Sequence, residues 1–133
     1  MDFTPIDAAQ AKALVYRGGR EGVIKELRRA LKARTGLTWS VTGGKGTAYG
    51  WIRIDAPPKE RRFDSTGTVE LTGTGPCGYM SLKRRKMLAD ALGLGQPTHC
   101  QGESIPSQYD YQQEYLERAN GLVPSVKGVA QWD

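Results

Sequence analysis

The chain contains few residues of the kinds that hold metals or attack substrates, with two cysteines and one histidine among 133 residues. A structural zinc site is tetrahedral and normally built from Cys and His, but Cys77, His99 and Cys100 are the only such residues here. A carboxylate could complete the set, and Cys77 could meet His99 across the fold. No C-x-x-C motif is present, and adjacent side chains usually point apart. We expect no metal, no cofactor and no enzymatic activity.

Long hydrophobic runs are also missing. No apolar stretch approaches the roughly 20 residues that a membrane-spanning helix needs. The opening residues, MDFTPIDAAQ, lack the basic and apolar regions of an export signal. Two thiols without such a signal fit a reducing compartment. These absences predict a cytoplasmic protein with no membrane partner.

The composition indicates one small domain with many loops. Hydrophobic residues make up only 38% of the chain, and 17 glycines and seven prolines indicate frequent turns. The net charge of +5 is uneven, because residues 1–62 carry 13 Lys and Arg against 6 Asp and Glu, whereas residues 63–133 carry 6 against 8. A basic half beside a near-neutral half predicts a positively charged face that attracts anions.

Two helices are expected in the basic half. Thr4 and Pro5 suit the start of a helix that runs to about residue 16, and the Arg-Gly-Gly-Arg sequence at 17–20 should break it. A second helix is predicted at 22–35, because its apolar residues fall on one stripe and Gly36 can end it. Its other face carries the cations Lys25, Arg28, Arg29, Lys32 and Arg34. Cations late in a helix complement its dipole, and solvated faces are often charged, but five exceed that need and favour contact with an anion.

A β-hairpin is predicted next, at residues 37–58. Apolar and polar residues alternate on both strands, as in half-buried strands, and Pro57 ends the second strand. The glycine-rich turn at 43–46 lacks the spacing of a phosphate-binding loop and is followed by a strand in place of a helix. Lys45 at this turn could still contact a phosphate backbone.

The second strand of the hairpin carries the best candidate for a binding surface. Its alternation places Tyr49, Trp51 and Arg53 on the face opposite to Ile52 and Ile54. Exposed aromatic rings can stack on bases while neighbouring cations meet phosphates. The alternative is that a helix covers this face and the rings belong to the core.

The remaining elements complete an α+β fold. We expect a third strand at 68–72, a helix at 81–92 capped by Ser81 and ended by Gly93, an ordered loop at 96–106 and a last helix from Ser107 to Gly121. The prediction is a single domain over 1–121 and a tail over 122–133. Its small antiparallel sheet of about three strands packs on one side against the helices at 22–35 and 81–92. The domain is expected to contain two to four helices in all.

The segment from Ile24 to Pro58 resembles a large-polyvalent-protein-associated domain, which shows a basic helix, a strand like WSV, a Gly-rich turn and a second strand ending near proline. Such domains occur in proteins of phages and conjugative elements, so the resemblance implies an accessory protein of a mobile element. The family offers no catalytic residues that could be assigned to positions in this chain.

Together, the basic helix and the hairpin predict a non-enzymatic protein that binds DNA or RNA. The alternative is an anti-defence inhibitor, of anti-CRISPR or anti-restriction type, that uses the same face against an acidic or nucleic-acid-binding protein. The oligomeric state stays open.

Overall fold

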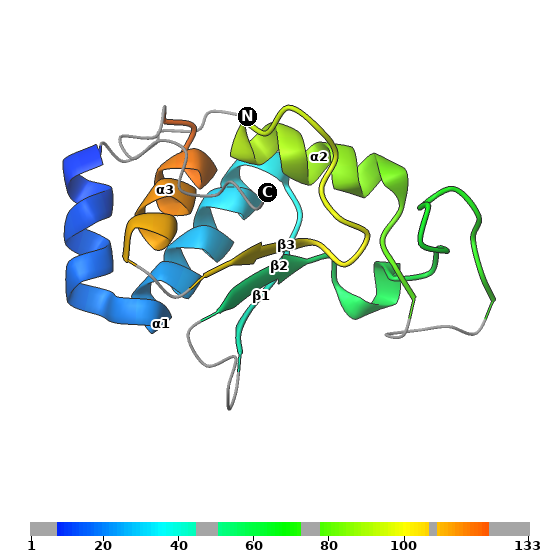
Figure 1. The fold of residues 1–133 in the computed structure, drawn as a ribbon, viewed down its shortest axis with the longest axis horizontal. Helices are drawn as coiled ribbons and strands as arrows, with labels where there is room; N and C mark the ends of the chain where they lie inside the picture. The colour runs from blue at the N-terminus through cyan, green and yellow to red at the C-terminus, as the bar shows by residue number, and fades with distance from the viewer. Residues whose placement is uncertain (1–7, 45–50, 73–77, 107–108, 123–133) are drawn as a thin grey trace.

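The structure is a computed structural model that describes residues 8–44, 51–72, 78–106 and 109–122, with the backbone alone for 8–18 and 109 (Figure 1). Within these ranges the chain forms helices α1 (Ala8–Thr35), α2 (Leu82–Leu92) and α3 (Tyr109–Ala119), a short 3-10 helix η2 (Pro58–Glu60), and strands β1 (Ser40–Gly43), β2 (Ile52–Asp55) and β3 (Glu103–Ile105). The strands make one antiparallel sheet in the order β1-β2-β3. The α+β class is therefore confirmed.

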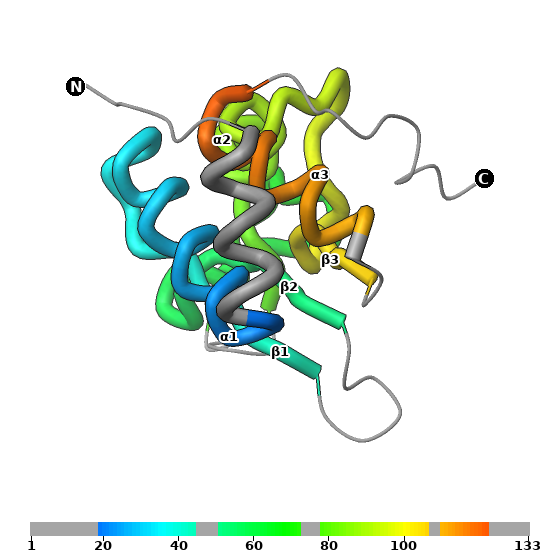
Figure 2. Tube along the Cα trace, turned by 90° about the vertical axis from the view of Figure 1, so that its left-hand side faces the viewer, coloured from blue at the N-terminus to red at the C-terminus, as the bar shows by residue number. Residues whose placement is uncertain are grey.

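Helices α1, α2 and α3 lie on one side of the sheet, as Figures 1 and 2 show. Between them lies the core, because alternate strand residues and the apolar stripes of the helices point into this layer. Trp39 belongs to this core, as expected, and its indole Nε1 donates a hydrogen bond of 2.9 Å to Thr35 Oγ1. The other members on α1 and the sheet are Val23, Ile24, Leu27, Ala30, Leu31, Val41, Ile52, Ile54 and Ile105.

The break predicted at residues 17–20 is confirmed as a kink in α1. Gly19 has φ 54° and ψ −150°, a conformation that a residue with a Cβ rarely adopts. The part after the kink follows the predicted stripe and ends at Gly36, whose φ is 79°. Ser81 caps α2 by accepting a hydrogen bond from the Arg84 N–H, and Gly93 ends α2 in the left-handed region.

The third strand lies elsewhere than predicted. The stretch at 68–72 forms only an isolated bridge between Phe63 and Glu70, and its apolar residues Val69 and Leu71 remain exposed. The third strand is β3, inside the 96–106 segment that the sequence predicts to be a loop. A strand of three residues is too short to show alternation, so pairing with β2 produces it.

The helical layer also differs from the prediction. Helix α3 packs against α1 and contacts β3, where the Tyr115 hydroxyl donates a 2.7 Å hydrogen bond to Glu103 Oε2. The expected layer contained only the helices at 22–35 and 81–92. The burial of α3 is not evident from its polar sequence. Gln113, Glu114 and Glu117 are nevertheless all nearly inaccessible to solvent.

Candidate functional site

The face of the sheet opposite the helices is open over much of its area. Thr42, Trp51, Arg53 and Ser104 are exposed there, whereas Ile52 and Ile54 on the other face have no accessible surface. This confirms the predicted orientation of Trp51 and Arg53, and Trp51 is 39% exposed. Tyr49 and Lys45 lie outside the described residues. The surface therefore combines an accessible indole with a cation.

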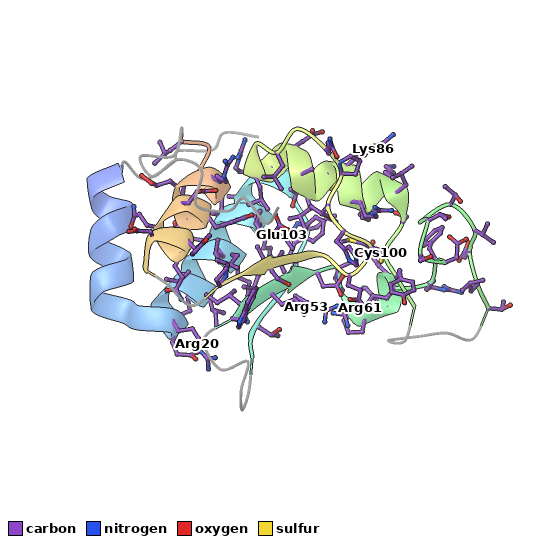
Figure 3. The ribbon with its side chains drawn as sticks, in the orientation of Figure 1. Arg20, Arg53, Arg61, Lys86, Cys100 and Glu103 are labelled. Carbon is purple, nitrogen blue, oxygen red and sulfur yellow. The ribbon has the colours of Figure 1, made fainter. Side chains whose placement is uncertain are left out.

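Arg53 is held in place by contacts on both sides. Its Nε donates a 3.1 Å hydrogen bond to the carbonyl of Gln101, and its Nη2 lies 3.5 Å from Asp55 Oδ2 (Figure 3). Asp55 also pairs with Arg61 at 3.3 Å. Burial raises the pKa of Asp55, while a hydrogen bond from the Ala56 N–H and the charges of both arginines act in the opposite direction. The side chain of Arg53 is thus positioned along the sheet surface.

A hollow of about 250 Å³ adjoins Trp51 and Arg53. The loop that leads into β3 forms its other wall, so strand β2 and this loop together make the site. The lining residues are Trp51, Arg53, His99, Gln101, Gly102, Glu103 and Ser104. The sequence singled out His99 only as a possible partner of the cysteines. It gives no sign that this loop adjoins β2, because only the pairing of β3 brings the two together.

A second feature is a row of cations on the outer side of α1. Four of the five predicted cations recur at helical spacing on one exposed face, which we call the basic strip: Lys25, Arg28, Arg29 and Lys32. Arg34 is not part of it, because its Nη1 donates to the carbonyl of Ala91 at the end of α2 and to that of Arg118. The structure thus brings together four of these side chains and turns the fifth toward α2.

Two members of the basic strip also support the fold. Arg28 Nη2 donates a 2.6 Å hydrogen bond to the carbonyl of Val41 on the edge strand β1. Arg29 is bound to Glu26 and to Asn120 Oδ1, the latter at 2.8 Å. Among the described residues, Lys25 and Lys32 have no hydrogen bond or ion pair with another side chain. Their ammonium groups are therefore available to an external anion.

The outer edge of β1 connects the basic strip to the open sheet face. Arg28 covers part of this edge through its hydrogen bond to the Val41 carbonyl. Arg20 lies against Gly43 at the end of β1, and its Nη1 donates a 2.8 Å hydrogen bond to the carbonyl of Gly44 just beyond the strand. The sequence places Arg20 in the break between helices and gives no sign of this role. The basic strip therefore reaches the edge of β1 at Arg28, and the next strand, β2, carries Arg53 and Trp51 on the open face.

The cysteine chemistry considered from the sequence has a weak geometric basis. Cys100 Sγ lies 3.5 Å from His99 Nδ1, but the same nitrogen accepts a 3.2 Å hydrogen bond from the Gln101 N–H. That lone pair is therefore already engaged, and Cys77 lies outside the described residues. Within the described part of the chain, no group of three or more His, Cys, Asp or Glu side chains could hold a metal ion.

On the helical side of the sheet, half-buried Glu103 and buried Tyr115 fix β3 to α3. Burial raises the pKa of Glu103, and the hydrogen bond from Tyr115 opposes this rise. Burial also raises the pKa of Tyr115, assisted by the adjacent carboxylate, so its hydroxyl remains a donor. This pair holds the wall of the hollow from the helical side.

Comparisons with protein-family models, curated proteins and solved structures found no match to this chain. The resemblance of residues 24–58 to a large-polyvalent-protein-associated domain, and the phage or mobile-element origin that it implies, stay predictions. Of the helices in the described residues, none has the length and apolar character that crossing a bilayer requires.

Proposed function

We propose that this protein binds nucleic acid without catalysing a reaction. The observation that carries the proposal is the basic strip, which reaches the edge of β1 through Arg28, together with the neighbouring strand β2, which exposes Trp51 and Arg53 on the open face. A cytoplasmic setting, in which Cys100 stays a thiol, forms part of the proposal.

The basic strip and the open face around Trp51 have the chemistry that binding to a polyanion requires. Lys25 and Lys32 would contact phosphates as mobile point charges, while Arg28 has further N–H donors besides the one that reaches Val41. Trp51 offers a surface for stacking, which does not depend on base identity. Binding of this kind is weakly selective for sequence and strongly sensitive to salt.

The test is fluorescence anisotropy with labelled single- and double-stranded DNA and RNA at several salt concentrations. With about four phosphate contacts, log K should fall with log[salt] with a slope of about −3 for single strands. A double substitution, Lys25→Glu with Lys32→Glu, should lower affinity at least tenfold and reduce the slope. These two lysines are chosen because reversing Arg28 or Arg29 would also remove contacts within the protein.

The matched control is Lys83→Glu with Lys86→Glu, which changes the net charge equally on exposed residues of α2. Equal losses in both variants would show that overall charge, and not the basic strip, determines binding. Absence of binding even at low salt would overturn the proposal. It would favour the alternative predicted from the sequence, a protein-directed inhibitor.

A further inference from the structure

The hollow beside Trp51 has the size and charge of a site for a neutral ring. Its volume of about 250 Å³ lies below the roughly 300–1,000 Å³ of typical small-molecule sites. Arg53 in its lining is paired with Asp55 at 3.5 Å, so the hollow does not concentrate positive charge as a phosphate site would. A single flat, uncharged ring system fits these properties better than a phosphate or a dinucleotide.

The walls of the hollow are formed before any ligand binds. A tight turn carries His99 and Gly102, with a 2.9 Å hydrogen bond from the Gly102 N–H to the His99 carbonyl. Arg85 on α2 holds the preceding residue, because its Nε donates 2.7 Å to the Thr98 carbonyl and its own carbonyl accepts from the Thr98 N–H. A preformed site loses less conformational entropy on binding.

The polar groups around the hollow can address both donors and acceptors. The Gln101 amide carries both kinds of group, and the Ser104 hydroxyl can act as either. Because His99 Nδ1 accepts a backbone hydrogen bond, the neutral imidazole carries its proton on Nε2 and can donate from there. Nucleobase edges present this mixture of donors and acceptors, and their faces can stack on the Trp51 indole.

We infer that this hollow receives one unstacked nucleobase, so that the protein selects single-stranded over double-stranded nucleic acid. This inference rests on the proposed nucleic-acid binding and deepens it. A base inside a duplex is stacked between its neighbours and paired, so its face is not available to the Trp51 indole. The phosphates on either side of the unstacked base would run from Arg53 toward Arg28 and the rest of the basic strip.

The experiment compares three labelled ligands of equal length by fluorescence anisotropy at one low salt concentration. These are a single strand, a blunt duplex, and a single strand whose central nucleotides are abasic, which keeps the phosphates and removes the bases. The full chain should bind the single strand about tenfold more tightly than the abasic strand, since stacking of one base is worth about this ratio.

Two substitutions locate the effect. Trp51→Leu and Ser104→Ala should each reduce the preference for the base-bearing strand, while affinity for the abasic strand stays unchanged. The matched control is Thr42→Ala, which removes a hydroxyl from the same open face outside the hollow. Circular dichroism of each variant establishes that the fold is intact.

The outcomes separate this inference from the proposed function. Equal binding of all three ligands, with no effect of Trp51→Leu, would overturn the base site and leave phosphate-driven binding standing. Loss of affinity for the abasic strand in Trp51→Leu would also overturn it, because the indole would then not be acting on a base. No binding of any ligand would overturn both.

Discussion

Gly102 lies where the 98–102 loop meets β2, and its backbone has a φ of 95°. A Cβ at this position would lie 1.9 Å from the carbonyl oxygen of Ile54. The close approach of loop and strand places Gln101 against Arg53 and so shapes the hollow. At the residue scale, the geometry of the candidate site depends on a glycine at position 102, because any Cβ there would clash with β2. A single sequence does not distinguish this glycine from the other sixteen.

Gly102→Ala should therefore destabilise the protein by about 2–4 kcal/mol, through backbone strain and the displacement of β2 or the loop. Chemical denaturation with urea measures this as a lower midpoint. The control is Gly95→Ala, because a Cβ at exposed Gly95 meets nothing within 4 Å and should change stability by less than about 0.5 kcal/mol. Equal midpoints for the two variants would contradict the close approach.

Strand β1 shows how the elements protect each other. It is an edge strand, and exposed edges present unpaired backbone groups that invite association with another chain. Arg28 of α1 donates to the carbonyl of Val41 and so occupies part of this edge. At the element scale, the basic helix therefore has a structural role in addition to the proposed role in binding.

Arg28→Ala is expected to cost about 1 kcal/mol of folding stability, because the Val41 carbonyl loses its partner. It should also increase self-association, measured by sedimentation velocity at rising protein concentration. Arg62→Ala provides the comparison, since Arg62 is 53% exposed and forms only a 3.6 Å surface pair with Glu70, a contact worth little. Identical stability and sedimentation of both variants would show that Arg28 does not protect the edge.

Across the whole molecule, two carboxylates link stability to pH, buried Asp55 and half-buried Glu103. Burial raises the pKa of Asp55 and of Glu103 above their values of 3.8 and 4.5 in unfolded chains. Because the folded-state pKa is the higher one, the unfolded chain loses these protons first as pH rises. Stability should therefore fall as pH increases from the unfolded values through the raised folded values, and stay level above them.

Glu103→Gln should reduce this decline, because glutamine keeps an acceptor for Tyr115 but has no charge to desolvate. Urea denaturation between about pH 4 and 7 would measure the change in slope. Asp90→Asn, at an exposed carboxylate on α2, is the control and should leave the slope unaltered. A wild-type slope in Glu103→Gln would show that Glu103 is not responsible for the decline.

The sequence alone was sufficient for the local features. Apolar periodicity located the core face of the 22–35 helix and of the hairpin strands, and Ser81, Gly36 and Gly93 marked helix ends through capping chemistry. The same alternation placed Trp51 and Arg53 on the opposite face from Ile52 and Ile54. These signals are readable because they depend on residues close in the chain.

The tertiary structure decided what depends on distant residues. Strand β3 exists through its pairing with β2, and α3 is buried despite a polar sequence because it packs against α1. Contacts across the fold also separate Arg34 from the basic strip and place the Arg20 guanidinium against Gly43 at the end of β1. The hollow beside Trp51 arises in the same way, since β2 and the loop before β3 are some 45 residues apart in the chain. Periodicity does not encode such contacts, which form only when the hydrophobic faces of separate elements are buried together.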